Sequence, residues 1–275
     1  MASLPPLMPA HRDATRAALP FGQDDERTQL ESLLTEGGSA LFFDVDGTLI
    51  DIASHPDGVD VPSHLIEDLA ILHDASGGAV ALVSGREAQV LDRLFAPLRL
   101  PLSGIHGAEL RTTASGDLAS TVAPLPEDVR AALAALTRRF EGLLVEDKGA
   151  SLALHYRSIP AAAPELEEAI GAIVSPRSRT LTVLPGRMVF EVKARGHDKG
   201  AAVRAFMAQA PFAGRVPIFF GDDVTDEAGF AAVRELGGIA VSIGRRLAGA
   251  DVMLEDAQAV RALVGRLAAT AQGRG

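Results

Sequence analysis

A pair of carboxylates, Asp44 and Asp46, directly follows an apolar segment, ALFF, and is followed in turn by Gly47 and Thr48. Residues i and i+2 of an extended segment point to the same side, so both carboxylates would project beyond the carboxyl end of one strand. With one carboxylate attacking phosphorus and the other holding a proton, the pair suits covalent phosphoryl transfer. Thr48 offers a hydroxyl and a backbone amide. Two solvated acids at a turn are the alternative, which the full DVDGT pattern disfavours.

A second acidic pair, Asp222 and Asp223, follows another apolar segment, VPIFF, and Gly221. Carboxylate oxygens are the ligands that Mg²⁺ prefers, and a divalent cation relieves the repulsion between neighbouring carboxylates. Asp226 and Glu227 continue the acidity into an expected helix start, where they complement the helix dipole. We interpret these two mainly as helix caps or supporting groups. The sequence therefore predicts a Mg²⁺ site at the end of this strand.

The formal net charge of −10 creates a field that repels an anionic substrate, so a few local cations must reverse it. Ser84-Gly85-Arg86 ends an apolar strand and opens an expected helix, where a hydroxyl and free amides make an anion site. Lys199 also opens a helix, after a loop. Each signal is weak alone, because Arg86 could simply pair with an acid and most lysines are solvated.

The elements that must position these residues alternate along the chain. Over residues 39–119 and again over 196–275, apolar strand-like runs alternate with helical patterns, which predicts right-handed crossovers and a mostly parallel, Rossmann-like sheet. Over residues 120–195 the order becomes helix-strand-strand, repeated twice. We therefore expect an α/β core domain with a separate α+β domain inserted into it. Residues 1–38 are expected to form an N-terminal extension with one short helix.

The inserted segment carries mixed charges at strand spacing. Glu146 and Lys148 are two residues apart, so they share one face of a strand, and Glu191 and Lys193 repeat this spacing. Mixed charges on a sheet face can bind sugar hydroxyls. They can equally form a solvated surface, which is the commoner case from spacing alone.

Composition limits the class of protein. The chain is 47% hydrophobic and 23% charged, as expected for a soluble globular protein. No run approaches the ~20 apolar residues of a membrane span, and the N-terminus lacks a secretory signal pattern. Cysteine is absent, which excludes disulfides and thiolate chemistry. The acidity, without a Lys/Arg-rich block, argues against a nucleic-acid partner. A cytoplasmic protein fits these features.

Together these residues resemble the haloacid dehalogenase superfamily of phosphatases. Its four motifs match, in order, DVDGT (44–48), Ser84, Lys199 and GDD (221–223), and the inserted segment is similar to its larger αββαββ cap. The segments that resemble the trehalose-6-phosphate phosphatase family within it are GIHGAEL (104–110), EDKGASLALHYR (146–157), PGRMVFEVKARGHDKG (185–200) and GDDVTDEAGF (221–230). This resemblance covers about residues 39–260. Ala194 departs from it, because family members often carry proline there, which should affect local stiffness rather than chemistry.

The resemblance implies a role for each motif residue. Asp44 would attack phosphorus and form an aspartyl-phosphate, while Asp46 would protonate the leaving sugar oxygen and later deprotonate the hydrolytic water. Mg²⁺ would be held by Asp44, the backbone carbonyl of Asp46 and Asp222, with Asp223 supporting. The residues that would hold the phosphate are Ser84, Lys199, Thr48 and Arg86.

The resemblance also implies a substrate class, a small-molecule sugar phosphate of the trehalose 6-phosphate kind. Glu146, Lys148 and Glu191 would contact the distal glucose hydroxyls, with His106, Arg187 and Lys193 as further candidates. A phosphatase or phosphomutase for another sugar phosphate is the alternative. A regulatory sugar-phosphate-binding domain without turnover is a third possibility, which the two intact acid pairs argue against. We expect a monomer or a weak homo-oligomer.

Overall fold

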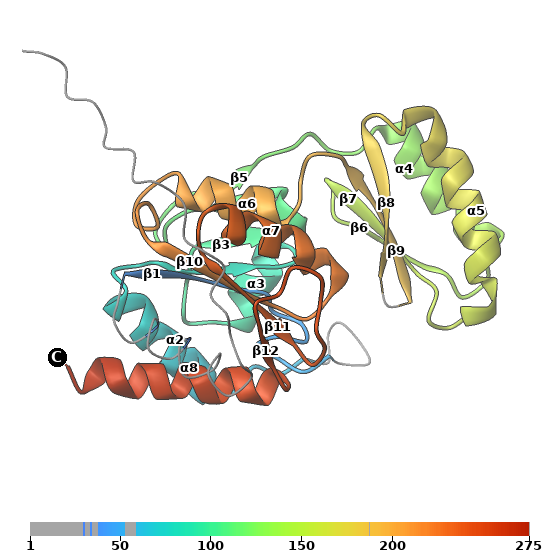
Figure 1. Cartoon of the computed structure of the whole chain (residues 1–275). Helices are drawn as coiled ribbons and strands as arrows, with labels where there is room; N and C mark the ends of the chain where they lie inside the picture. The colour runs from blue at the N-terminus through green and yellow to red at the C-terminus, as the bar shows by residue number, and fades with distance from the viewer. Residues whose placement is uncertain (1–29, 31–33, 35–37, 53–58, 187, 275) are drawn as a thin grey trace, which may run out of the picture.

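The computed structural model describes Leu30, Leu34 and residues 38–52, 59–186 and 188–274. Its described helices are α2 (Ser63–Ala75), α3 (Ala88–Leu94), α4 (Glu127–Ala134), α5 (Ala163–Val174), α6 (Lys199–Met207), α7 (Glu227–Glu235) and α8 (Ala257–Gln272) (Figure 1). Its described strands are β1 (Ser39–Phe43), β2 (Val80–Val83), β3 (Leu102–Gly104), β4 (Glu109–Arg111), β5 (Ala119–Ser120), β6 (Leu144–Asp147), β7 (Ser151–His155), β8 (Leu181–Gly186), β9 (Val189–Ala194), β10 (Val216–Gly221), β11 (Ile239–Ile243) and β12 (Val252–Leu254). Apart from Leu30 and Leu34, the expected N-terminal helix lies outside the described residues.

The larger sheet has eight strands in the order β12-β11-β10-β1-β2-β3-β4-β5. The strands from β12 to β3 are parallel, and only β4 and β5 run antiparallel to their neighbours. This confirms the predicted α/β class with a mostly parallel sheet. Phe43 of β1 pairs with Phe220 of β10 and with Leu82 of β2. The residues that follow these three strands therefore leave the sheet side by side at one edge.

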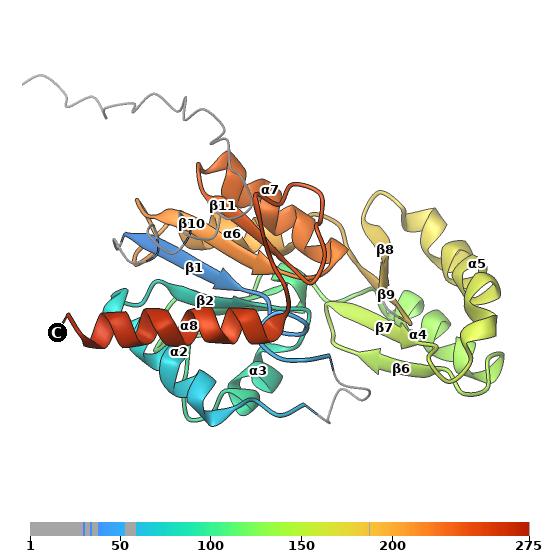
Figure 2. The same ribbon diagram turned by 60° about the horizontal axis from the view of Figure 1, so that its bottom comes forward.

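Both faces of this sheet are buried, which explains why its strands are continuously apolar rather than alternating. In β1, Leu41 and Phe43 pack in the layer that also contains α2 and α8. Ala40 and Phe42 pack in the opposite layer, with residues of α6 and α7. Figure 2 shows α8 crossing one face of the sheet, with α6 and α7 on the other. No helix in the described ranges is both long and apolar enough to cross a membrane.

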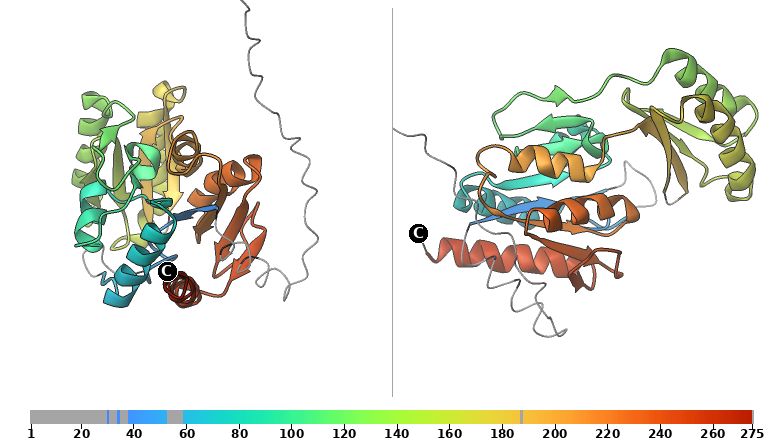
Figure 3. Two further views of the ribbon diagram at one scale, coloured as in Figure 1. Left: turned by 90° about the vertical axis from the view of Figure 1, so that its left-hand side faces the viewer. Right: turned by 45° about the horizontal axis from the view of Figure 1, so that its top comes forward.

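The second sheet is antiparallel, in the order β6-β7-β9-β8. Its chain order is α4-β6-β7-α5-β8-β9, the predicted αββαββ pattern, and it lies between β5 and α6 in sequence. Leu152 and Leu154 of β7 pack with α4 and α5 in a third apolar cluster. Because strand side chains alternate, Ser151 lies on the opposite face, which is turned toward the core (Figure 3). We call residues 120–195 the cap; these boundaries remain a prediction.

Candidate active site

Asp44 lies at the carboxyl end of the central strand β1 and is 4% exposed. Lys199, the first residue of α6, donates from Nζ to Asp44 Oδ1 at 2.7 Å. Thr48 Oγ1 donates to Asp44 Oδ2 at 3.3 Å. A buried carboxylate held at both oxygens has a fixed direction of attack, which is what a nucleophile requires.

Asp44 belongs to a cluster of three carboxyls. Ligand atoms of Asp44, Asp222 and Asp226 all lie within 4.8 Å of one another. Asp226 Oδ2 accepts from the backbone N–H groups of Asp222 and Asp223, at 3.0 Å each, and its Oδ1 accepts from Lys199 at 2.6 Å. Asp226 thus forms a capping box with Asp223 at the short turn before α7, and its side chain makes no capping bond to α7 itself. It also joins the loop after β10 to Lys199, which lies beside Asp44.

Two glycines leave room for the carboxyls of this cluster to lie close to one another. Gly47 has φ +86°, and a Cβ there would lie 2.1 Å from Asp222 Oδ2. A Cβ on Gly221 would lie 2.3 Å from Cγ of Asp226. The glycines of DVDGT and GDD are therefore required by the close packing of the acidic cluster, because a real Cβ atom cannot approach so closely.

The electrostatics of the cluster favour an added cation. Burial raises the pKa of Asp44 to about 7, although Lys199 opposes the shift. Burial, together with the charge of Asp44, raises the pKa of Asp222 to about 7, and burial also raises the pKa of Asp226. Burial alone would lower the pKa of Lys199, but the carboxylates of Asp226 and Asp44 raise it above its ordinary value. One ammonium group faces three carboxyls, so the donor set fits a divalent cation.

The loop after β2 lines the same cavity as Asp44. Ser84 is buried, and its Oγ accepts from the backbone N–H of Arg86 at 3.1 Å. Arg86 donates from Nε and Nη2 to the two carboxylate oxygens of Asp46, at 2.6 Å each. The pairing of Arg86 with an acid, left open by the sequence, is present here and orients Asp46.

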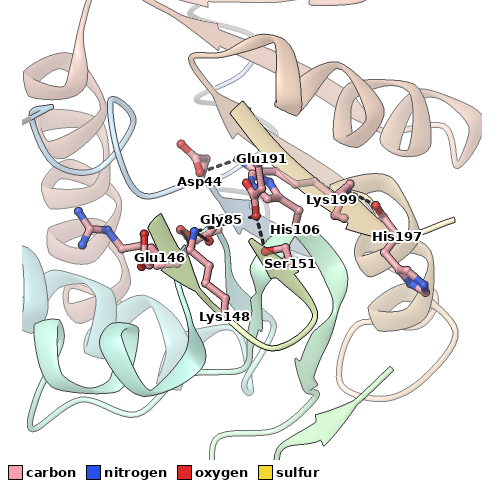
Figure 4. Close-up of polar contacts among 12 residues, drawn as sticks. Asp44, Gly85, His106, Glu146, Lys148, Ser151, Glu191, His197 and Lys199 are labelled. Carbon is pink, nitrogen blue, oxygen red and sulfur yellow. Dashed lines mark hydrogen bonds and ion pairs between the residues drawn. The ribbon is translucent and has the colours of Figure 1, made fainter. Parts of the chain in front are cut away.

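The cap supplies the opposite wall (Figure 4). Glu191 of β9 accepts from Ser151 Oγ at 2.5 Å and lies 3.0 Å from His106 Nε2. Lys148 Nζ donates to the backbone carbonyl of Gly85 at 3.1 Å and lies 4.0 Å from Glu191 Oε1. Burial alone would raise the pKa of Glu191, but His106, Lys148 and Ser151 hold it below its ordinary value. A cap carboxylate is therefore kept ionised directly opposite the core.

Core and cap together enclose a cavity of about 1310 Å³. The predicted site residues that line it are Asp44, Asp46, Ser84, Arg86, His106, Glu146, Lys148, Glu191, Lys199, Asp222 and Asp223. Lys193 instead lines a neighbouring cavity of about 300 Å³ and donates to the carbonyl of His197. Arg187 lies outside the described residues. Asp223 pairs with Arg245 at 2.9 Å rather than joining the carboxyl cluster.

Sequence reasoning missed three groups that the structure places at the site. Ser151 precedes the alternating Leu152 and Leu154, and this alternation already places it on the polar face of its strand. Arg245 follows β11, whose carboxyl end lies beside that of β10, so its position was available from strand order alone. His155, which lies 3.1 Å from Glu146 Oε2, has no signal beyond strand pairing.

Known proteins share both sequence and fold with this chain. The family model for trehalose-phosphatases matches residues 42–251. The trehalose-6-phosphate phosphatase of Escherichia coli (strain K12) is 43% identical over 209 residues, covering 74% of this chain and 77% of the relative. A probable trehalose-phosphate phosphatase of Sinorhizobium fredii is 41% identical over 231 residues, covering 83% of this chain and 87% of the relative.

Among solved structures, the C-terminal domain of C. albicans trehalose-6-phosphate phosphatase superposes with a TM-score of 0.77 at 22% identity. It covers 88% of this chain and 96% of that domain. This likeness confirms the fold. The family match and the two similar sequences show the family to which the chain belongs. The chain belongs to the trehalose-phosphatase family.

Proposed function

We propose that the chain hydrolyses trehalose 6-phosphate to trehalose and phosphate through an aspartyl-phosphate on Asp44. The observation that carries this proposal is the buried Asp44–Lys199 pair at the base of a cavity whose far wall is the polar face of the cap. Phosphoryl transfer depends mainly on positioning and charge neutralisation, and both are supplied at this point. The names of the relatives support the choice of sugar phosphate.

In the proposed reaction, an oxygen of Asp44 bonds to phosphorus as the bond between phosphorus and the sugar O6 breaks. Asp46, on the same side of the segment, gives its proton to O6, and trehalose leaves. Asp46 then takes a proton from water as that water attacks phosphorus, which breaks the bond to Asp44 and releases phosphate. Lys199 and Ser84 line the cavity and offer donors to the phosphate, and Arg86 lies beside it while orienting Asp46. Thr48 does not line the cavity, and its hydroxyl holds Asp44, so its proposed phosphate contact is left to its backbone amide.

Asp44 and Asp222 are the groups we propose to hold Mg²⁺, with the backbone carbonyl of Asp46. When bound, the ion supplies positive charge to the phosphate oxygens and to the neighbouring carboxylates. Asp226 accepts three hydrogen bonds, two of them from backbone N–H groups of the loop after β10, so we assign it to orienting this loop. Asp223 is proposed to support the site through its pairing with Arg245.

The cap residues Glu146, Lys148 and Glu191 are proposed to contact the distal glucose. Glu191 is buried and Lys148 is half-buried against the core, and Glu146 lines the same cavity while pairing with His155. A carboxylate accepts from sugar hydroxyls and an ammonium donates to them, so this set complements an uncharged disaccharide. The buried position of Glu191 replaces the surface interpretation that spacing alone had left open.

Phosphate release tests the proposal. The unmodified protein, with and without Mg²⁺, is compared on trehalose 6-phosphate, glucose 6-phosphate, sucrose 6-phosphate and an aryl phosphate. We expect Mg²⁺-dependent release that is fastest with trehalose 6-phosphate, and a loss of roughly 10³-fold or more for Asp44→Asn. Preference for another sugar phosphate would overturn the substrate. Movement of phosphate between sugar positions without net release would identify a mutase, and retained turnover by Asp44→Asn would exclude Asp44 as nucleophile.

A further inference from the structure

The turn between β3 and β4 has a backbone that L-residues rarely adopt. Ile105 has φ 47°, His106 has φ 50° and Gly107 has φ 102°. Two successive non-glycine residues with positive φ, one of them β-branched, cost free energy and persist only where surrounding contacts hold them. Such a turn at the edge of the cavity raises the question of what it positions.

The backbone of this turn is bonded to the loop of residues 84–86, which we call the phosphate loop because we propose that it faces the phosphate. The N–H of His106 donates to the carbonyl of Ser84 at 3.0 Å, and the N–H of Ile105 donates to the carbonyl of Arg86 at 2.9 Å. The imidazole lies against Gly85, where an added Cβ would be 2.5 Å from Nε2. The position of the ring is therefore fixed relative to the residues that face the phosphate.

The imidazole reaches from the core to the cap. Its Nε2 lies 3.0 Å from Glu191 Oε2, and its Nδ1 is buried without a hydrogen-bond partner among the described residues. Burial lowers the pKa of His106, which favours the neutral ring, although Glu191 opposes the shift. Because Nε2 faces a carboxylate, the tautomer with hydrogen on Nε2 is the one that makes this bond. Among the described residues, Glu191 is its one side-chain hydrogen-bond partner.

We propose that His106 is a positioning residue, which fixes the sugar-facing carboxylate of Glu191 against the phosphate loop instead of itself reading the sugar. The distance between the sugar site and the phosphate site would then be set by the core. This inference rests on the proposed function, because it assumes that Glu191 contacts the substrate. It reassigns His106, whose resemblance-based role is a direct sugar contact. Ser151 holds the same carboxylate from within the cap and serves as a comparison.

Two substitutions at position 106 distinguish the effect of the ring's hydrogen-bond donor from the effect of the backbone conformation of the turn. His106→Asn retains a side chain that tolerates positive φ, but its amide is too short to reach Glu191. His106→Gln places an amide N–H about as far from Cα as Nε2 and so restores the donor. Ser151→Ala removes the other donor to Glu191 and leaves the contact between core and cap in place. Thermal melts of each variant check that the fold is retained.

The experiment measures kcat/KM on trehalose 6-phosphate and on p-nitrophenyl phosphate, which is too small to contact both sites. We expect His106→Asn to lower the ratio of the two kcat/KM values by about 10- to 100-fold, the value of a hydrogen bond to a charged group. His106→Gln should recover most of this loss. When Glu191→Gln is already present, His106→Asn should add less than about 3-fold, because the two residues act as one unit.

Full additivity in the double variant would overturn the proposal in favour of a direct sugar contact. Equal losses on both substrates, without recovery by His106→Gln, would overturn it in favour of a general structural role. Failure of the proposed function is read separately, from the unmodified protein on the sugar-phosphate panel. If another sugar phosphate is preferred there, the same variants on that substrate decide the role of His106.

Discussion

Asp46 and Arg86 form a pair in which Nε and Nη2 of the guanidinium donate to the two carboxylate oxygens, at 2.6 Å each. A planar fork of this kind fixes the orientation of the carboxylate, which a lysine ammonium cannot do. At the residue scale, Arg86 therefore fixes the direction of the ionised carboxylate, and the oxygen that carries the proton in the proposed acid step must first leave its bond to Arg86. This role is distinct from supplying positive charge to the phosphate.

Arg86→Lys keeps the charge and removes the fork. We expect kcat on trehalose 6-phosphate to fall by about 10- to 100-fold, within the contribution of general acid–base catalysis. The loss on p-nitrophenyl phosphate should be much smaller, because that leaving group departs without a proton. Initial rates on both substrates check this. Equal losses on the two would mean that Arg86 acts through the phosphate alone.

A second prediction at the residue scale concerns the replacement of Gly47. A Cβ at this position meets the Asp222 carboxylate and also strains a backbone with φ +86°. Gly47→Ala should abolish Mg²⁺-dependent turnover, because Asp222 must move to admit the methyl group. Gly214→Ala is the matched control: its φ is +80° and nothing lies within 4 Å of the added Cβ. It should lose about 1–2 kcal/mol of stability from backbone strain and keep its activity. Turnover by Gly47→Ala at the unmodified rate would contradict the packing argument.

At the scale of elements, a buried arginine joins β4 to α3. Arg111 is 1% exposed; it donates twice to Asp92 of α3, at 2.6 and 2.8 Å, and twice to the carbonyl of Leu100. Glu109 of β4 accepts from the N–H of Ala88 at the start of the same helix, at 2.7 Å. These bonds attach α3, the helix after the loop of residues 84–86, to β4, the strand that follows the His106 turn.

Asp92→Asn tests this connection. Hydrogen bonding from Arg111 lowers the pKa of Asp92, so the ionised carboxylate stabilises the folded state. That stabilisation is present above the unfolded pKa of about 4 and is lost as pH falls through the lower folded pKa. The carboxylate is partly exposed, so we expect a cost of about 1–2 kcal/mol at pH 7 that shrinks below pH 4. Urea unfolding across pH, with exposed Asp117→Asn as control, measures it; a pH-independent difference would contradict the ion-pair explanation.

The helices and strands were predictable from the sequence because the spacing of apolar residues and the positions of turn residues are local features that determine them. The helix SHLIEDLAILHDA and the αββαββ order are present as expected. The site was predictable where a residue follows a central strand, as Asp44 and Asp222 do, because parallel strands bring such residues to one edge. The Asp46–Arg86 pair depends on how two loops of the core pack, and the His106–Glu191 contact depends on how cap and core pack; no local pattern encodes either.

At the scale of the whole molecule, the acidic cluster that we propose to bind Mg²⁺ lowers the stability of the metal-free protein. Asp44 and Asp226, which are buried, and Asp222, which is half-buried, place three carboxyls around one ammonium, so the metal-free fold carries their repulsion. A ligand that binds only the folded state raises its stability by mass action. Mg²⁺ should therefore stabilise the entire protein, and part of the stability of the molecule should be conditional on the ion.

Thermal melts with and without Mg²⁺ test this conditional stability, independently of activity. Asp222→Asn removes one charge from the cluster, so we expect the metal-free variant to melt about 2–4 °C higher than the unmodified protein, equivalent to about 1 kcal/mol. The same variant should lose the rise in Tm that Mg²⁺ gives. Glu235→Gln, which alters an exposed pair with Arg204, should change neither value. A metal-free Asp222→Asn protein that melts lower, or that still responds to Mg²⁺, would show that Asp222 stabilises the fold by itself and does not hold the ion.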